Sequence, residues 1–189
     1  MTARPPISTP ICLPQLIIRF LCRPDLPALE WDGEYAHFRR LYTEIFENAC
    51  QGKAVLWVAE LPNVGIIGQL FVQLRSSRSE LADGIERAYI YGFRIKPAYR
   101  GFGVGTRMLQ IAEKYLAQRK FRRLTLNVTR ENRSARHLYQ QLGFRLVGPD
   151  PGRWSYIDDR GIQRDVHEPA WRMEKMIISE NEVKNMLDN

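Results

Sequence analysis

The chain has 189 residues, of which 44% are hydrophobic, and this suits one domain with a buried core. No apolar run approaches the ~20 residues that span a bilayer, and the proline-broken first residues do not resemble the apolar region of a signal peptide. We therefore expect a cytoplasmic protein that does not enter the membrane. The net charge of +7 fits nucleic-acid binding or a single anionic cofactor. No run of five Lys and Arg residues occurs, which disfavours nucleic acid.

The cysteines and histidines form no recognisable metal or disulfide pattern. Cys12, Cys22 and Cys50 are far apart, and the three histidines fall in no H-E-x-x-H motif. We therefore predict that the cysteines are free thiols and that the protein has no catalytic metal.

The first half of the chain combines apolar strand patterns with one amphipathic helix. A loose leader is expected at residues 1–14 and a turn or short helix at residues 23–31. The helix is predicted over residues 34–50, with Asp32 as its N-cap and Gly52 as its stop. Strands are predicted at residues 15–22, 54–61 and 64–74, followed by a polar loop at residues 75–84.

The second half alternates strands and helices. Gly143 is placed to end the second helix in a left-handed cap, with Phe144 making the usual hydrophobic contact. Residues 149–168 are polar and turn-rich and can hold a hairpin, and residues 179–189 form a polar tail. Helices are predicted at residues 104–118 and 132–142, and strands at residues 88–97, 122–128, 145–148 and 170–177.

A glycine-rich turn, Arg100-Gly101-Phe102-Gly103-Val104-Gly105, joins the strand that ends at Pro97 to the next helix. The first turn of a helix offers unpaired backbone N–H groups and partial positive charge, and glycines let a ligand approach closely. The turn therefore predicts a phosphate or pyrophosphate site, with a purely structural turn as the alternative. Nearby Arg94, Lys96 and Arg107 add positive charge.

The spacing of this turn excludes two common nucleotide motifs. A dinucleotide fold requires G-x-G-x-x-G and an acidic residue ~20 positions later, and a P-loop requires Gly-Lys followed by Ser or Thr. The turn instead reads R-x-x-G-x-G at Arg100, Gly103 and Gly105, which resembles the acyl-coenzyme A pyrophosphate loop of the GNAT N-acetyltransferase superfamily. Two further segments share the resemblance: residues 93–97, and N-x-x-A-x-x-x-Y-x-x-x-G-F from Asn132 to Phe144. The matched segments lie within residues 86–148.

The resemblance implies an α/β fold of the α+β type. Its centre would be a mixed, mostly antiparallel, splayed sheet of about seven strands flanked by helices, in one domain over residues 15–178. It also implies transfer of an acetyl group from acetyl-CoA to an amine. The residues expected to hold the cofactor are Phe93, Arg94, Ile95, Arg100, Gly101, Phe102, Gly103, Val104, Gly105, Thr106 and Asn132.

Gly92 lies inside the strand before the turn, where a glycine indicates a bulge or close packing under an aromatic ring. A bulge would free N–H groups near Phe93 to Ile95 to polarise the thioester carbonyl. Tyr139 is the candidate general acid for the departing thiolate, with a half-buried core tyrosine as the alternative. Asn132 resembles the family's cofactor-contacting asparagine and would also serve as an N-cap.

Glu86 is the candidate general base, since it begins the strand in which the family often holds a glutamate. Tyr89 and Tyr91 compete with it. Strand alternation puts Tyr89, Tyr91 and Phe93 on one face and Glu86 on the other, unless a bulge changes the register.

Two other functions remain open. One is a non-catalytic acyl-CoA-binding or protein-interaction module on the same fold; the other is nucleic-acid binding, which steep salt dependence would reveal. A homodimer is compatible with the sequence. Acceptor choice is expected to depend on residues 31–52, 75–84 and 149–168.

Overall fold

The computed structural model describes residues 15–177. The leader expected at residues 1–14 and the tail expected at residues 179–189 lie outside the described residues. The helices are α1 (Arg39–Cys50), α2 (Val104–Gln118) and α3 (Arg133–Gln141), with short 3-10 turns at Arg23–Glu30, Ala36–Phe38 and Pro97–Tyr99. The strands are β1 (Ile17–Phe20), β2 (Ala54–Leu61), β3 (Gly65–Gln73), β4 (Arg87–Ile95), β5 (Arg123–Thr129), β6 (Arg145–Asp150), β7 (Arg153–Ile157), β8 (Gln163–His167) and β9 (Ala170–Met176).

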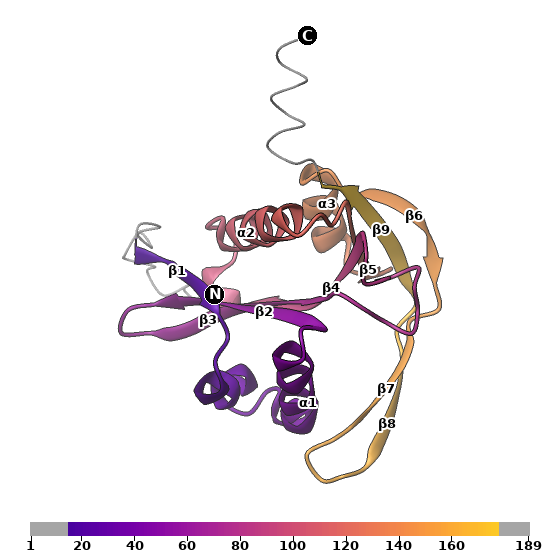
Figure 1. Cartoon of the computed structure of the whole chain (residues 1–189). Coiled ribbons are helices and arrows are strands. Elements are labelled where there is room, and N and C mark those ends of the chain that lie inside the picture. Colours follow the sequence, from indigo (N-terminus) through magenta and orange to yellow (C-terminus); the bar gives the residue numbers. More distant parts are fainter. Residues whose placement is uncertain (1–14, 178–189) are drawn as a thin grey trace, which may run out of the picture.

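Seven of the strands form one sheet in the order β1-β2-β3-β4-β5-β9-β6. Only β4 and β5 run parallel among the paired strands of the described chain. Figure 1 shows α2 and α3 on one face of this sheet and α1 on the other. Each face has its own apolar core: Met108 and Leu109 of α2 belong to one, and Tyr42 and Ile45 of α1 to the other. The expected mixed sheet of about seven strands flanked by helices is confirmed.

The sheet opens between its two central strands. β4 and β5 pair from Arg87↔Arg123 to Ile90↔Leu126, and the rest of β4, Tyr91 to Ile95, has no partner on β5 within the described chain. Parallel strands normally continue their ladder as long as both extend. The early end of this one leaves a wedge-shaped gap at the middle of the sheet, next to the start of α2.

β4 also bulges at the point where it leaves β5. Its partners on β3 are Gln69↔Arg94 and then Phe71↔Tyr91, so Gly92 and Phe93 together face one residue of β3. Gly92 has φ +57, and a Cβ built on it would lie 2.6 Å from the Phe71 ring. Both sequence-based interpretations of Gly92, the bulge and the close aromatic packing, are confirmed.

The bulge changes which face of the sheet the next side chains reach. Tyr89 and Tyr91 stack with their ring centroids 6.1 Å apart, and Tyr91 packs with the core under α1. Phe93 instead packs against the core under α2. The change of register that a bulge was expected to cause is present: Phe93 no longer shares a face with Tyr89 and Tyr91, because the extra residue shifts the alternation of side chains by one position.

The start of α1 differs from the prediction. Trp31 and Asp32 both take left-handed dihedrals, with φ 47 and 58, and turn the chain before any helix forms. The α-helix begins at Arg39 after a 3-10 turn, and its N-cap, Phe38, makes no side-chain cap hydrogen bond. The N-cap role predicted for Asp32 is wrong, since the backbone needs that residue for the turn.

The ends of α3 follow the sequence prediction. Asn132 caps the helix, its Oδ1 accepting the Ala135 N–H at 3.0 Å. Gly143 takes φ +90, the Phe144 N–H donates to the Tyr139 carbonyl at 2.9 Å, and Phe144 is buried. This is the predicted glycine cap with its hydrophobic contact.

The polar segment after β6 forms the predicted hairpin. β7 and β8 pair from Arg153↔His167 to Ile157↔Gln163 as a separate two-stranded sheet. Figure 1 shows the hairpin reaching down beside α1. Tyr156 of β7 lies against Phe38 with a centroid separation of 4.8 Å, which fastens the hairpin to the start of α1.

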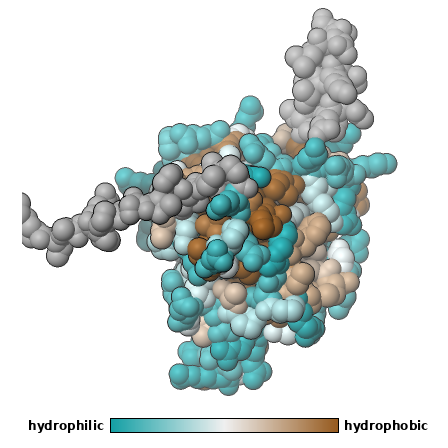
Figure 2. All heavy atoms as spheres, turned by 90° about the vertical axis from the view of Figure 1, so that its left-hand side faces the viewer, coloured by the Kyte–Doolittle hydropathy of each residue, from teal (hydrophilic) through white to brown (hydrophobic). Residues whose placement is uncertain are grey.

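The side of the molecule that carries β1 is seen in Figure 2, where apolar residues gather near the middle of the face and hydrophilic residues surround them. Ile17 and Phe20 of this edge strand are about half exposed. Within residues 15–177, no helix is both long and apolar enough to cross a membrane.

Candidate functional site

A cavity of about 720 Å³ lies in the opening between β4 and β5. It lies between the unpaired half of β4, the end of β5, α3 and α1, with β7 at one side. Its walls combine apolar and aromatic side chains with many polar and charged ones. The lining includes Glu44, Arg78, Tyr89, Tyr91, Gly92, Phe93, Arg94, Asn127, Asn132, Tyr139, Asp150 and Trp154.

The bulged strand directs backbone N–H groups into this opening. The Lys96 N–H donates to the Ile67 carbonyl of β3 at 2.8 Å, and Arg94 faces Gln69 of the same strand. Backbone groups alternate in direction along a regular strand, so the N–H group of Ile95 is expected to point to the opposite side, where β5 has departed. The N–H group of Phe93 is expected there as well if the bulge leaves it unpaired with β3. A thioester or amide carbonyl in the gap could accept hydrogen bonds from these N–H groups.

The glycine-rich turn follows directly. Gly101 and Gly103 take φ +83 and +77, and Gly103 is the N-cap of α2 with no side-chain cap hydrogen bond. The first helical hydrogen bond runs from the Arg107 N–H to the Gly103 carbonyl at 3.0 Å. The N–H groups of Val104, Gly105 and Thr106 precede that bond, so the helix itself gives them no i−4 partner. Within residues 15–177 no backbone hydrogen bond engages these three amides, and they lie at the positive end of the helix.

Gly105 connects this turn to the bulge. A Cβ built on Gly105 would lie 3.2 Å from Cζ of Phe93, so the helix and the strand touch where only hydrogen atoms fit. Phe93 therefore lies between the cavity and the start of α2: it lines the cavity, whereas Gly105 touches Phe93 and residues 100–106 do not line the cavity themselves. Phe102 and Thr106 of the turn are partly exposed.

Arg100 lies at the glycine-rich turn as expected, whereas Arg94 does not. Arg100 lies at the turn, where its Nε donates to the Ile95 carbonyl at 2.9 Å. Arg94 does not reach the turn: its guanidinium lies 4.1 Å from the Tyr35 ring centroid and donates to the Tyr42 hydroxyl at 2.9 Å. The side chain of Arg94 was expected to add positive charge at the glycine-rich turn. It lies instead on the face of the sheet that α1 covers, because the bulge directs it there.

Tyr139 of α3 lines the cavity and also packs against the core, with its ring 5.7 Å from that of Phe144. The described residues give its hydroxyl no hydrogen-bond partner. Burial raises the pKa of Tyr139 to about 12, with a smaller contribution from Tyr89, so the hydroxyl keeps its proton at neutral pH. Asn132, two turns before it, lines the same cavity; the cap uses its Oδ1 and leaves its amide N–H groups as donors.

Tyr89 and Tyr91 line the cavity from β4. Burial raises the pKa of Tyr89 to about 12, with Asp150 adding to the effect. Burial also raises the pKa of Tyr91, with further contributions from Tyr89 and Glu44. Both hydroxyls are neutral near pH 7, so neither is an ionised base there.

Glu86 is not brought to the cavity. It precedes β4, and its carboxylate lies 3.7 Å from Nε of Arg123 in an ion pair. Its carbonyl accepts the N–H groups of Arg122 and Arg123 at 2.7 and 2.9 Å. These contacts place Glu86 where β4 and β5 first meet, at the opposite end of β4 from the bulge.

A carboxylate that does line the cavity is Glu44 of α1. It is exposed, and no ion pair or hydrogen bond joins its side chain to another described residue. No motif marks it along the chain, because its place on an amphipathic helix is that of an ordinary solvated charge. Only the topology, which lays α1 under the bulge, makes it a site candidate.

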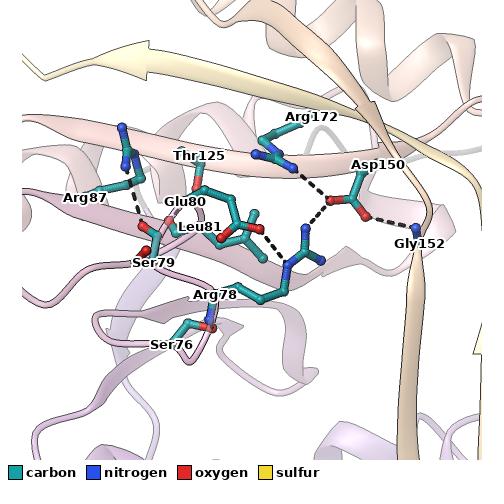
Figure 3. A network of polar contacts seen from close by, with 10 residues as sticks. All are labelled: Ser76, Arg78, Ser79, Glu80, Leu81, Arg87, Thr125, Asp150, Gly152 and Arg172. Atoms are coloured by element: carbon teal, nitrogen blue, oxygen red, sulfur yellow. Dashed lines mark hydrogen bonds and ion pairs between the residues drawn. The ribbon is translucent and has the colours of Figure 1, made fainter.

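A second missed group is the ion pair between Arg78 and Asp150, drawn in Figure 3. Nη2 of Arg78 donates to Oδ2 of Asp150 at 2.6 Å, Arg172 reaches the same oxygen at 3.3 Å, and the Gly152 N–H donates to Oδ1 at 2.8 Å. The Asp150 side chain is wholly buried. Burial alone would raise the pKa of Asp150, but these donors outweigh it and the pKa lies below its usual value. The network ties the loop before β4 to the far edge of the sheet.

Comparisons with known proteins agree with this arrangement. A sequence model described as the acetyltransferase (GNAT) family matches residues 23–144. The uncharacterized N-acetyltransferase YycN of Bacillus subtilis (strain 168) is 30% identical over 89 residues, 47% of this chain and 54% of that protein. The 5-NmdU N-acetyltransferase of Pseudomonas phage PaMx11 is 35% identical over 63 residues, 33% of this chain and 43% of that protein.

The chain thus spans about half the length of these curated relatives. Among solved structures, Ard1 from Thermoplasma volcanium superposes with a TM-score of 0.67 at 14% identity, over 87% of this chain and 99% of that one. At this identity the likeness establishes the shared fold.

Proposed function

Because the chain belongs to the GNAT acetyltransferase family, we propose that it transfers an acetyl group from acetyl-CoA to a primary amine by direct attack in a ternary complex. The observation that carries the proposal is the opening between β4 and β5, bordered by open amides on the bulge and on the first turn of α2. A thioester carrier with a diphosphate needs both sets of donors along one border.

The proposed placement of acetyl-CoA follows from the chemistry of its parts. The diphosphate would lie on the turn from Arg100 to Thr106, where helix-end amides and the dipole favour an anion. The pantetheine arm would lie along Phe93 to Ile95 in place of the missing strand. The thioester carbonyl would then accept hydrogen bonds from the bulge, which stabilise the oxyanion as it forms.

Tyr139 is proposed to stabilise the departing thiolate. A phenol with a pKa of about 12 is a weaker acid than a thiol of pKa ≈ 8.5, so complete proton transfer to the sulfur would be uphill by roughly 5 kcal/mol. A hydrogen bond from the phenol to the thiolate costs no such transfer and is worth about 1.5–3 kcal/mol. We therefore assign Tyr139 this donation. The nitrogen of the tetrahedral intermediate gives up one proton to a base, and the sulfur takes its final proton from water, so that one proton in total passes from nitrogen to sulfur.

The amine must be neutral when it attacks, and a carboxylate near it can accept its proton. Glu86 was the base expected from the sequence, but its distance from the bulge along β4 and its pairing with Arg123 do not support that role. Glu44 lies on the cavity wall. We propose Glu44, directly or through water, as the proton acceptor.

A matched pair of variants tests this assignment. We expect Glu44→Gln to lower kcat/KM for the amine about tenfold, while Glu86→Gln stays within twofold of wild type. Rates would be measured by thiol release at saturating acetyl-CoA from about pH 6 to about pH 9. The opposite ranking, with Glu86→Gln the slower enzyme, would return the base role to Glu86.

The proposed activity is tested by release of free coenzyme A thiol from acetyl-CoA over a panel of amines: polyamines, peptide N-termini, lysine side chains and aminoglycosides. Release that depends on one amine class supports the proposal and identifies the acceptor. Tight binding of acetyl-CoA with no amine-dependent release would favour the non-catalytic acyl-CoA-binding module.

A further inference from the structure

We infer that Gln69 of β3 is a positioning residue for acyl transfer: its buried side-chain amide fixes the bulge of β4 from which Phe93 and Ile95 direct their N–H groups into the gap. The inference rests on the proposed function, since it concerns the alignment of the same thioester.

Gln69 is one of the few polar side chains that the described core encloses completely, with 0% of its surface exposed. Its Nε2 donates to the Gly92 carbonyl at 3.1 Å, and its Oε1 has no hydrogen-bond partner among the described residues. The same amide lies close enough to the Tyr42 hydroxyl to help lower the pKa of that phenol, although burial still raises it overall. The bond to Gly92 is therefore the contact that holds this side chain to β4.

The position of that bond explains why a glutamine is there. The bulge removes Gly92 from the regular β3–β4 ladder, because two residues of β4 face one of β3. The carbonyl of Gly92, which is only partly exposed, then needs another donor. Gln69 pairs with Arg94 on one side of the bulge, and its side chain reaches back to supply that donor.

The other end of the bulge is held separately. The Arg94 guanidinium packs on the rings of Tyr35 and Phe38, at 4.1 and 5.1 Å from their centroids, and donates to Tyr42 of α1. With Gly92 fixed by Gln69 and Arg94 fixed by α1, the peptide groups between them have one orientation. Such preorganisation is what stabilising an oxyanion requires.

The test compares Gln69→Leu with Thr125→Val. Thr125 is also buried but does not line the cavity, and its hydroxyl donates to the Leu81 carbonyl at 2.7 Å. Both variants lose a buried side-chain donor. We expect Gln69→Leu to lower kcat at least about tenfold with the Kd for coenzyme A within twofold of wild type, and Thr125→Val to keep wild-type kcat. Equal kcat in the two variants would overturn the inference.

Gln69→Glu gives a readout that a merely structural role would not produce. When protonated, the introduced carboxyl can donate to the Gly92 carbonyl, whereas the ionised form cannot. Burial and this hydrogen bond both raise its pKa. The rate relative to wild type should therefore be highest in acid and fall as pH rises, and a pH-independent ratio would contradict the inference.

Hydrogen exchange separates failure of this inference from failure of the proposed function. If the wild-type protein transfers nothing to any amine, the proposed function fails, but exchange over residues 91–95 still reports on the bulge. Faster exchange there in Gln69→Leu than in Thr125→Val supports the positioning role, and equal exchange overturns it.

Discussion

The Gly92→Ala variant should lose acyl transfer and much of its stability. The new methyl group would lie 2.6 Å from Cδ2 of Phe71, a ring that is 1% exposed and cannot move aside. The residue would also have to keep φ +57, which residues with a side chain disfavour. Overpacking and backbone strain together predict a loss of about 2–4 kcal/mol in the free energy of unfolding, measured by urea denaturation.

The activity loss should exceed what reduced stability explains. Relief of the clash requires the bulge to shift, and a displacement of its N–H groups by about 1 Å from the carbonyl oxygen can cost about 100-fold in rate. Gly65→Ala is the control, because Gly65 also has a positive φ, +85, but open space around its Cβ position. Similar losses in both variants would show that backbone strain alone acts, and that the packing of Phe71 under the bulge is unimportant.

Tyr139→Phe should lower kcat about 10- to 100-fold and leave the Kd for acetyl-CoA nearly unchanged. The hydroxyl is expected to interact with the sulfur only as negative charge develops there, so its loss acts on the transition state rather than on binding. The size follows from a hydrogen bond to a charged group, about 1.5–3 kcal/mol. Tyr115→Phe is the control, since its hydroxyl contacts Arg119 on α2, outside the cavity lining. Wild-type kcat in Tyr139→Phe would assign Tyr139 to the core alone.

The pH dependence of this variant follows from the raised pKa. Since burial holds the pKa of Tyr139 at about 12, the hydroxyl stays protonated up to about pH 11. The ratio of wild-type to variant kcat should then be constant from about pH 7 to about pH 10. In the folded protein the tyrosine binds its proton more tightly than in the unfolded chain, whose tyrosines have a pKa of about 10. Stability from this group is therefore complete below about pH 10 and is lost as pH rises towards about 12.

The fold was largely predictable because its elements carry local signals. The spacing of apolar residues in α2, the cap at Asn132 and the Gly143 stop each depend on a few neighbouring residues, and the structure places all three where the pattern predicts. The N-cap role predicted for Asp32 was wrong for the opposite reason. The residue type favours a cap, but it does not indicate that the backbone takes a left-handed conformation there.

Only the contiguous part of the proposed site could be named from the sequence. The turn after Arg100 and the segment around Tyr139 are short motifs, so their residues could be named from the sequence. Glu44, Gln69 and Asp150 come to the site from separate strands and helices, and no spacing along the chain reports that meeting. The face of Phe93 depended on whether β4 has a bulge, because a single extra residue reverses the face of every side chain after it.

The most direct test of the account is calorimetric titration of the wild-type protein and of Gly103→Val with coenzyme A and with pantetheine, which lacks the diphosphate. Gly103 takes a φ of +77 as the N-cap residue that begins α2, and a β-branched residue strongly disfavours that conformation. Coenzyme A should bind the wild-type protein at least about tenfold more tightly than pantetheine does, and Gly103→Val should lose this difference while remaining folded. Equal affinity of wild type for the two ligands, or an unchanged preference in Gly103→Val, would contradict the claim that these amides hold a diphosphate.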